Sequence, residues 1–277
     1  MTRTVFAALF GVLPGVLLVT VALAAPTKEL VTKQMTHDPE ALRPLFAADA
    51  LVVLPAGVTT GALPNGKLRW FLSSNEAYFN DSTAGKLTTG TRGDVSWVAL
   101  DFKQPYRVAV DCPPESGTCD RKRTLRMTEL IVGGKGVAAH IDDPARGKRE
   151  PAASVPIAPS TDAGPLTAML ADPTALAAAL LDDPATSVFG TEEGERAVGL
   201  AASKKLVTSW SKLSLAVDGK PREVRTATWG YAAANVAWKS KTKTITMRAT
   251  VFAVMVGTAW KAVAVHYSLP YERVMYE

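Results

Sequence analysis

An internal repeat constrains the fold of this 277-residue chain more than any other feature. The segment DPEAL (38–42) is followed 134 residues later by DPTAL (172–176). In both, the Asp side chain can cap a helix by accepting backbone N–H bonds, and Pro suits the first helical position. Apolar residues follow at helical spacing. The pattern predicts a helix near the start of each of two similar halves.

Two further matches occur in the same order along the chain. KGVAAHIDDP (135–144) and KAVAVHYSLP (261–270) share Lys, Val, Ala, His and Pro, and TLRM (124–127) resembles TITM (244–247). Between the halves, residues 144–165 contain five prolines and no periodic apolar face, which is typical of a linker. We therefore predict a tandem duplication with a linker over 144–165.

Within the second half, helical periodicity precedes strand alternation. Helices are expected over 173–181 and 193–210, and strands over 212–217, 223–233, 235–239, 242–256 and 259–269. Asp218-Gly219 and residues 239–242 have the composition of hairpin turns. Helices followed by hairpin-connected strands predict an α+β fold, with helices on one face of a mainly antiparallel sheet.

The N-terminal segment has the pattern of a signal peptide over residues 1–24. Arg3 precedes an uncharged apolar run over 5–23, and Ala22-Leu23-Ala24 forms the small-x-small cleavage pattern. An uncleaved N-terminal anchor is the alternative. Cleavage after Ala24 would place the protein in a bacterial periplasm or outside the cell, without stable membrane insertion.

The charge of the chain argues against nucleic acid as a partner. Lys and Arg total 31 against 26 Asp and Glu, so the formal net charge is +5. The excess is divided evenly between the halves, and neither contains a basic tail. This balance lacks the concentrated positive patch that nucleic-acid binding requires.

The two cysteines, Cys112 and Cys119, lie in DCPPESGTCD (111–120). In an exported protein this spacing predicts a disulfide at the tip of a β-hairpin. Closing so short a loop would contribute about 2–3 kcal/mol in the chain-entropy model.

Three segments carry a resemblance to a known family. FAADALVVLPAGVTTG (46–61), GDVSWVALDF (93–102) and AWKAVAVHYSLP (259–270) resemble SnoaL-like domains, which belong to the superfamily of ketosteroid isomerase and nuclear transport factor 2. The resemblance implies two tandem cone-shaped domains, over 27–143 and 166–277. In each, N-terminal helices would pack on a strongly curved, mainly antiparallel sheet, often around an apolar pocket. The closing pattern is complete only in the second half, so the first domain is the degenerate one.

Alternation along the last strand places small residues and one histidine on a shared face: Trp260, Ala262, Ala264, His266 and Ser268. One interpretation is that this face packs closely against a helix. In the other, His266 points into a cone cavity whose walls include Trp210, Trp229 or Tyr231. His266 is then the weak candidate for a catalytic residue.

Metal binding needs three or four converging ligands, and the histidines His37, His140 and His266 are dispersed along the chain. We expect neither a metal nor a cofactor. In the second half no interior carboxylate is evident from the pattern. In the first half Asp101 and Glu129 could equally be solvated residues on an exposed sheet face.

The sequence therefore predicts an exported two-domain protein that binds a small apolar ligand or an envelope protein, with no assignable reaction. The alternative is an isomerase- or hydrolase-like enzyme that uses His266 in the second domain. An assembly module is a third class. Trp97 and Trp238, in similar Val-Ser-Trp and Val-Ala-Trp contexts, indicate that the two domains could pack as an intramolecular pseudo-dimer.

Overall fold

The computed structural model describes residues 43–54, 57–60, 83–108, 119–144, 157–239 and 241–270. The predicted signal peptide, the helix expected after Asp38 and Cys112 lie outside these residues, so the signal peptide and the disulfide stay predictions. In the part of the chain that the structure describes, no helix is long and apolar enough to cross a membrane.

The first of two six-stranded sheets has the strand order β2-β1-β6-β5-β4-β3. A short 3₁₀ helix, η1 (Arg43–Leu45), leads into it. Its strands are β1 (Phe46–Leu54), β2 (Gly57–Thr60), β3 (Thr83–Arg92), β4 (Val95–Val108), β5 (Cys119–Val132) and β6 (Lys135–Asp142). Among these pairs, only β1 and β6 run parallel.

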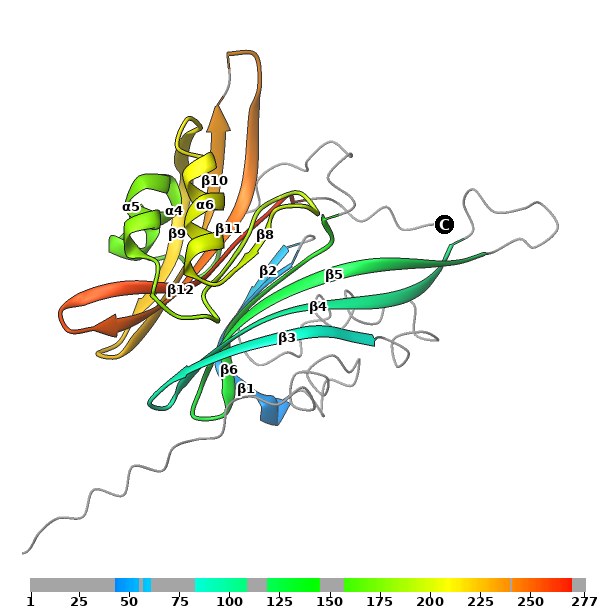
Figure 1. The fold of residues 1–277 in the computed structure, drawn as a ribbon, viewed down its shortest axis with the longest axis horizontal. Coiled ribbons are helices and arrows are strands. Elements are labelled where there is room, and N and C mark those ends of the chain that lie inside the picture. The colour runs from blue at the N-terminus through cyan, green and yellow to red at the C-terminus, as the bar shows by residue number, and fades with distance from the viewer. Residues whose placement is uncertain are drawn as a thin grey trace, which may run out of the picture.

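The second sheet has the order β8-β7-β12-β11-β10-β9, which is the order of the first sheet strand for strand. Its strands are β7 (Ser187–Phe189), β8 (Arg196–Val198), β9 (Ser214–Arg225), β10 (Trp229–Lys239), β11 (Thr244–Val256) and β12 (Ala259–Ser268). The helices α4 (Pro165–Ala171), α5 (Pro173–Ala179) and α6 (Leu200–Ser209) cover its face away from the first sheet (Figure 1). The α+β class is confirmed.

The helix α5 forms as its sequence predicts. Asp172 accepts hydrogen bonds from the backbone N–H groups of Thr174 and Ala175, at 2.9 and 3.0 Å, and Pro173 occupies the first turn. Leu176 is buried in the core between the helices and the second sheet, with Leu166 of α4 and Val207 of α6. Burial of this apolar face holds the three short helices on the sheet.

Several predicted boundaries in the second half are wrong. The strand expected over 223–233 crosses the turn between β9, which ends at Arg225, and β10, which begins at Trp229 and continues through 235–239. The helix expected over 193–210 begins only at Leu200, because Gly199 has φ +85° and the residues before it form β8. Asp218-Gly219 is not a hairpin turn: β9 continues from Ser214 to Arg225, and a register shift against β10 absorbs the extra residues.

A bulge recurs at the same place in both closing hairpins. The β5–β6 register shifts between Leu130 and Ile131, and the β11–β12 register shifts between Phe252 and Ala253. On β12 the shift interrupts the expected alternation. Ala262 consequently packs with the helix-side core, whereas His266 faces the first sheet.

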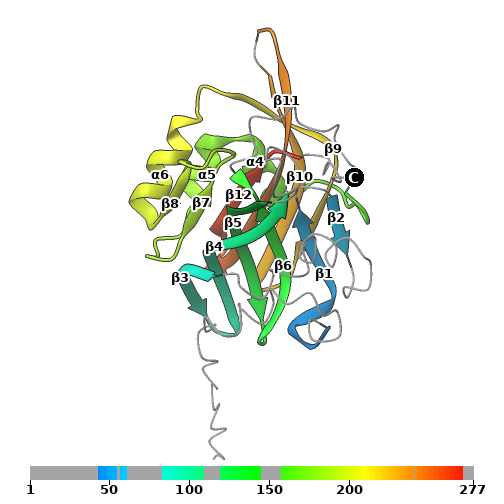
Figure 2. The ribbon, with the colours of Figure 1, turned by 90° about the vertical axis from the view of Figure 1, so that its right-hand side faces the viewer.

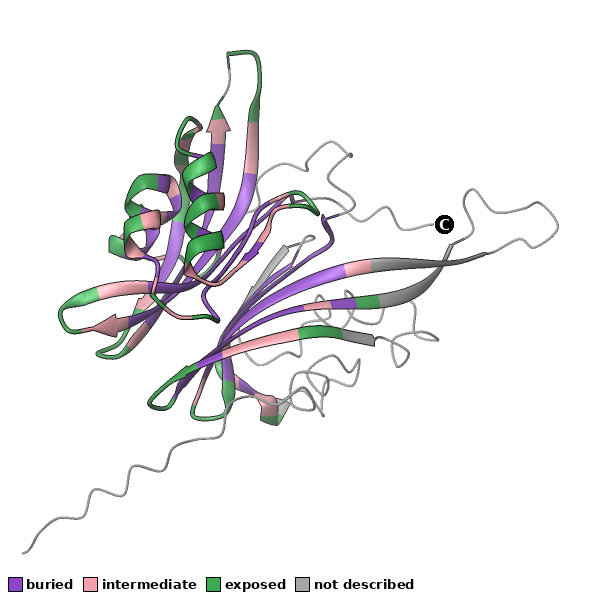
Figure 3. Ribbon diagram, in the orientation of Figure 1, coloured by how far each residue is buried: buried purple, intermediate pink, exposed green. Residues whose placement is uncertain are grey.

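The two sheets pack against each other through an apolar core that both supply. Trp97 and Leu130 of the first sheet are buried with Tyr231, Phe252 and Val263 of the second. Figure 2 shows the strands of the two sheets lying across one another, and in Figure 3 the buried segments concentrate where they meet. Trp238 does not share the position of Trp97, because it packs against the helix-side core instead.

Candidate functional site

His140 and His266 meet at the centre of the inter-sheet contact. The closing strands β6 and β12 carry them, and each pairs in register with a threonine, Thr128 on β5 and Thr250 on β11. Their rings stack with centroids 3.9 Å apart and planes 19° from parallel. Both side chains are completely buried.

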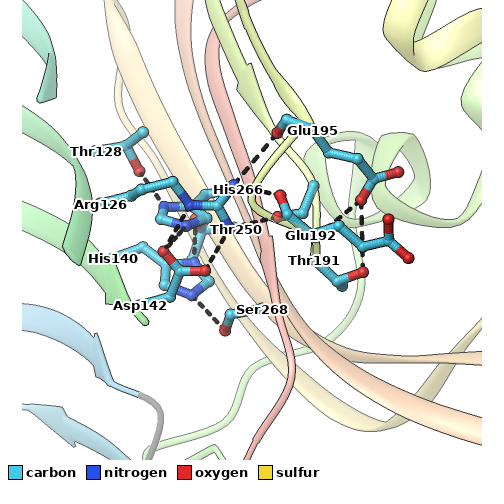
Figure 4. Close-up of polar contacts among 11 residues, drawn as sticks. Arg126, Thr128, His140, Asp142, Thr191, Glu192, Glu195, Thr250, His266 and Ser268 are labelled. Atoms are coloured by element: carbon cyan, nitrogen blue, oxygen red, sulfur yellow. Dashed lines mark hydrogen bonds and ion pairs between the residues drawn. The ribbon is translucent and has the colours of Figure 1, made fainter. Parts of the chain in front are cut away.

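Each histidine is held by side chains of the opposite sheet (Figure 4). His140 Nδ1 lies 3.0 Å from Thr250 Oγ1, and its Nε2 lies 2.8 Å from Ser268 Oγ. His266 Nδ1 lies 3.2 Å from Thr128 Oγ1, and its Nε2 lies 3.1 Å from Asp142 Oδ1. The contacts are reciprocal, and they fix the lateral position of one sheet on the other.

Burial lowers the pKa of both histidines. The pKa of His140 is well below 6.5, first because of burial and then because Arg248, Arg126 and any proton gained by His266 oppose a positive charge on its ring. Burial also lowers the pKa of His266, and Asp142 offsets only part of that effect. Both rings are therefore neutral at pH 7. Because a carboxylate only accepts hydrogen bonds, the proton of His266 belongs on Nε2, beside Asp142.

Asp142 is a buried carboxylate that keeps its charge. Burial by itself would raise its pKa, but the contacts with His266 and Arg126 outweigh burial and lower it from 3.8. Arg126 approaches Asp142 with two nitrogens, Nε at 3.0 Å from Oδ1 and Nη2 at 2.5 Å from Oδ2. This two-pronged geometry is the strongest arrangement of arginine with a carboxylate.

The same guanidinium of Arg126 reaches into the second sheet. Nη2 donates to the carbonyl of Gly190 at 2.7 Å, and Nη1 donates to the carbonyls of Glu192 and Glu195 at 2.9 and 3.3 Å. These carbonyls belong to the turn between β7 and β8, called the 190–195 turn below. Arg126 is only 2% exposed, so water does not solvate its guanidinium. The carboxylate of Asp142 and the carbonyls of the 190–195 turn balance its positive charge instead.

Arg248 occupies the position in the second sheet that corresponds to Arg126 in the first. Each arginine lies two residues before the threonine that pairs with a histidine. Arg248 Nη1 donates to the carbonyl of Leu54, where β1 ends, just as Arg126 reaches the residue after β7. Burial lowers the pKa of Arg248 to about 10.

A pocket of about 180 Å³ lies at one end of the second sheet, beside the 190–195 turn. The end of α6 and strands from β9 to β12 complete its walls. Its lining comprises Gly190, Thr191, Glu192, Glu195, Trp210, Leu213, Leu215, Trp238, Met247 and Tyr267.

Glu195 is the most constrained polar group of this pocket. Its Oε1 accepts a hydrogen bond from Trp210 Nε1 at 3.0 Å, and its Oε2 accepts from the backbone N–H of Glu192 at 3.1 Å. Thr191 Oγ1 donates to the same Oε2 at 3.5 Å. The carboxylate lies close over Gly190, where an added Cβ would come within 2.3 Å of Oε2.

The structure does not bring the predicted site residues together. Trp210 lines the pocket, whereas His266, Trp229 and Tyr231 lie toward the first sheet. Trp229 and Tyr231 stack there with centroids 6.5 Å apart, and Arg222 Nε donates to the Tyr231 hydroxyl at 3.2 Å. The bulge on β12 leaves Trp260 and Ala262 on the helix side and His266 toward the first sheet, the side on which Trp229 and Tyr231 of β10 also lie.

Sequence reasoning missed Glu195 and the two arginines. Residues 193–210 were expected to be one helix, in which Glu195 would be an ordinary solvated acid. The arginines had a signal in Arg126-Met-Thr128 and Arg248-Ala-Thr250, but the TLRM/TITM match aligned Met127 with Met247. The paired registers show that the correspondence is shifted by two residues.

Glu129 and Asp101 differ from the solvated residues that one alternative required, although the Asp101 side chain is still 26% exposed. Glu129 is completely buried, and Asp101 Oδ2 lies 2.6 Å from Arg196 Nε of the second sheet. Among the described residues there is no group of three His, Cys, Asp or Glu side chains that could hold a metal ion. The expected lack of a metal stays a prediction.

Comparison with known proteins gives a likeness to solved structures only. No family model and no curated protein matches the chain. An NTF2-like protein of unknown function from Pseudomonas putida is 16% identical, covering 39% of this chain and 83% of its own, with a TM-score of 0.33. A ketosteroid isomerase-like structure from Parabacteroides distasonis is 15% identical, covering 40% and 95%, with a TM-score of 0.32.

A nuclear transport factor 2-like protein from Salmonella enterica is 21% identical, covering 40% of this chain and 87% of its own, with a TM-score of 0.32. Each alignment spans about two-fifths of the chain.

Proposed function

We propose that this protein binds a small, mainly apolar molecule in the pocket beside the 190–195 turn. The observation that carries the proposal is a hollow with apolar and aromatic walls and a fixed carboxylate, Glu195, at its edge. Ligand sites have this general composition, in which an apolar lining supplies affinity and a few placed polar groups supply orientation.

The size of the pocket limits the ligand. A cavity of about 150 Å³ can hold one benzene molecule. The present pocket of about 180 Å³ therefore suits one ring, or an aliphatic group of similar size, with a short substituent.

The charge of the lining selects the polar end of the ligand. Glu192 and Glu195 are the charged residues among those that line the pocket, and no Lys, Arg or His is among them. Trp210 and Trp238 add aromatic faces, which attract cations. A protonated amine next to Glu195 matches both features.

Three probes that share a ring test this proposal: benzylammonium, benzyl alcohol and benzoate. In calorimetric titrations at pH 7 we expect benzylammonium to bind most tightly and benzoate least. Glu195→Gln should remove the preference for the amine, whereas Glu193→Gln, an exposed acid of the same turn outside the lining, should preserve it. Failure of all three probes to bind would contradict the proposal.

The alternative predicted from sequence, a reaction at His266, stays an untested alternative. His266 is completely buried and is not among the residues that line the pocket. A protein partner of the cell envelope stays the alternative occupant. Competition between benzylammonium and proteins of the host envelope would distinguish the two.

We further propose that the chain is a tandem duplication of SnoaL-like, NTF2-like domains over 27–143 and 166–277, joined by the 144–165 linker and packed as an intramolecular pseudo-dimer. The identical strand orders and the recurring bulge support this division. If the halves, expressed separately, are soluble monomers that do not associate, the pseudo-dimer is wrong.

The proposed location is a bacterial periplasm or the extracellular space, after cleavage behind Ala24. The mass of the protein purified from its host tests this. A mature chain that begins at Ala25 supports cleavage, and a chain that retains residues 1–24 supports the anchor.

A further inference from the structure

We propose that Arg126, a residue of the first sheet, is a positioning residue for the pocket of the second sheet. The inference rests on the proposed ligand site, and it makes that site dependent on both halves of the chain. Arg126 does not line the pocket, so its effect must pass through the 190–195 turn.

The 190–195 turn is closed by its own backbone hydrogen bonds, Gly190 N–H to the Glu195 carbonyl at 2.8 Å and Glu195 N–H to the Glu192 carbonyl at 3.0 Å, and Arg126 adds a support from the other sheet. Its backbone joins β7 and β8, strands of three residues each, and its six residues contribute four of the lining residues. Arg126 binds the carbonyls of Gly190, Glu192 and Glu195, at both ends and in the middle of the turn. One planar guanidinium therefore joins three carbonyls of the turn and braces, together with the turn's own hydrogen bonds, the backbone that carries the Glu195 carboxylate.

Arg126 is itself held in place by residues of the two sheets on the side away from the turn. Asp142 holds its Nε and Nη2, and His266 Nε2 lies 3.1 Å from the same carboxylate. All three side chains are buried, so water does not compete with these contacts. A contiguous path runs from His266 through Asp142 and Arg126 to the turn, and then through Glu195 to Trp210.

Arginine is required by this geometry. A guanidinium presents five donors in one plane and satisfies the carboxylate and the carbonyls together. The ammonium of lysine has three donors and cannot keep the same set in place. Arg126→Lys thus retains the positive charge while removing the planar fork.

The second sheet provides a matched control. Arg248 is equally buried but reaches Leu54, and Ser268 stands where the first sheet has Asp142. Leu54 is not part of the pocket lining. Arg248→Lys should thus perturb the inter-sheet contact to a similar degree without acting on the 190–195 turn.

The experiment compares the full-length protein with Arg126→Lys, Asp142→Asn and Arg248→Lys. Calorimetry with benzylammonium should show affinity about 10-fold weaker for Arg126→Lys, since a hydrogen bond to a charged group typically contributes an effect of this size. Asp142→Asn should weaken binding in the same direction. Arg248→Lys should bind within about twofold of wild type, a change close to what unrelated sites show.

A second readout does not depend on the ligand. Hydrogen exchange of the backbone amides over 190–195 should accelerate in Arg126→Lys and stay at the wild-type rate in Arg248→Lys. If wild type binds benzylammonium and both arginine variants bind it equally well, the positioning role is wrong while the proposed function stands. If wild type binds no probe, the proposed function fails, and unchanged exchange in Arg126→Lys would overturn the positioning role as well.

Discussion

His140 and His266, 126 residues apart in the chain, stack ring on ring; His140 contacts the hydroxyl groups of Thr250 and Ser268, and His266 contacts the hydroxyl group of Thr128 and the carboxylate of Asp142. An apolar contact between sheets tolerates some sliding. These directional contacts allow one arrangement only, so the histidine pair defines how the sheets align. That alignment in turn places Arg126 against the 190–195 turn.

His140→Ala should act mainly on stability, because Arg126, Asp142 and His266, which connect to the 190–195 turn, keep their contacts with one another. The substitution opens a cavity and leaves Thr250 and Ser268 without their imidazole partner, which should cost about 2–4 kcal/mol of the free energy of unfolding. Urea unfolding at pH 7 measures the loss. Affinity for benzylammonium should stay within about twofold of wild type. A variant as stable as wild type would show that the stacked pair contributes little.

Acidification should destabilise the protein in two separate pH ranges. The folded-state pKa of each histidine lies below 6.5, so below about pH 6.5 the unfolded chain binds protons that the folded chain does not, and stability falls. The pKa of Asp142 is lowered from 3.8, so its contribution is lost only at lower pH, as the pH falls through its folded-state pKa. Urea unfolding at pH 7, 6 and 5 tests the first range.

His140→Gln is the matched variant for the histidine effect, because glutamine retains hydrogen-bonding groups but does not titrate. The decline in the free energy of unfolding between pH 7 and pH 5 should be smaller in this variant than in wild type. Equal stability of wild type at pH 7 and pH 5 would contradict the assignment of neutral, buried imidazoles.

Gly190→Ala should displace the Glu195 carboxylate. An added Cβ would lie 2.3 Å from Glu195 Oε2, so the side chain must move. Benzylammonium affinity should fall by roughly an order of magnitude, as expected for a lost charge-assisted contact. Gly194→Ala is the control, because nothing lies within 4 Å of an added Cβ there. A loss of affinity that is equal in the two variants would mean that the turn as a whole, and not the carboxylate, is affected.

Trp210→Phe should loosen Glu195 while keeping an aromatic wall. The change removes the indole N–H that donates to Glu195 Oε1 at 3.0 Å. We expect the affinity for benzylammonium to drop several-fold and stability to change by about 1 kcal/mol, the usual net value of one hydrogen bond. Trp238→Phe should have a smaller effect on the preference for the amine over benzyl alcohol. If Trp238→Phe reduced the preference for the amine more than Trp210→Phe, the polar end of the ligand would lie beside Trp238 and not beside Glu195.

Local patterns predicted the parts of this fold that local physics decides. The Asp-Pro start of α5, the paired strands β11 and β12, and the α+β class follow from capping, alternation and turn chemistry. The repeat also singled out His140 and His266 as corresponding residues. The repeat could not predict that the two histidines stack on each other, because this contact depends on which faces of the two sheets pack together.

Two physical causes account for the site that the sequence did not predict. A bulge adds a residue to β12 and reverses the face on which His266 lies, and simple alternation has no means of marking it. Glu195 lies in a turn whose acids look solvated, and it lines the pocket because this turn folds back on itself, contacts Trp210 and is reached by Arg126 from another sheet. Both causes depend on contacts between distant parts of the chain, which a local sequence pattern does not record.

A crystal structure of the full chain soaked with benzylammonium is the most direct measurement of the central claim. We expect density for one ring between Trp210, Trp238 and Met247, with the ammonium nitrogen within hydrogen-bond distance of a Glu195 carboxylate oxygen. Density for the probe only at other places, with the pocket unchanged, would contradict it.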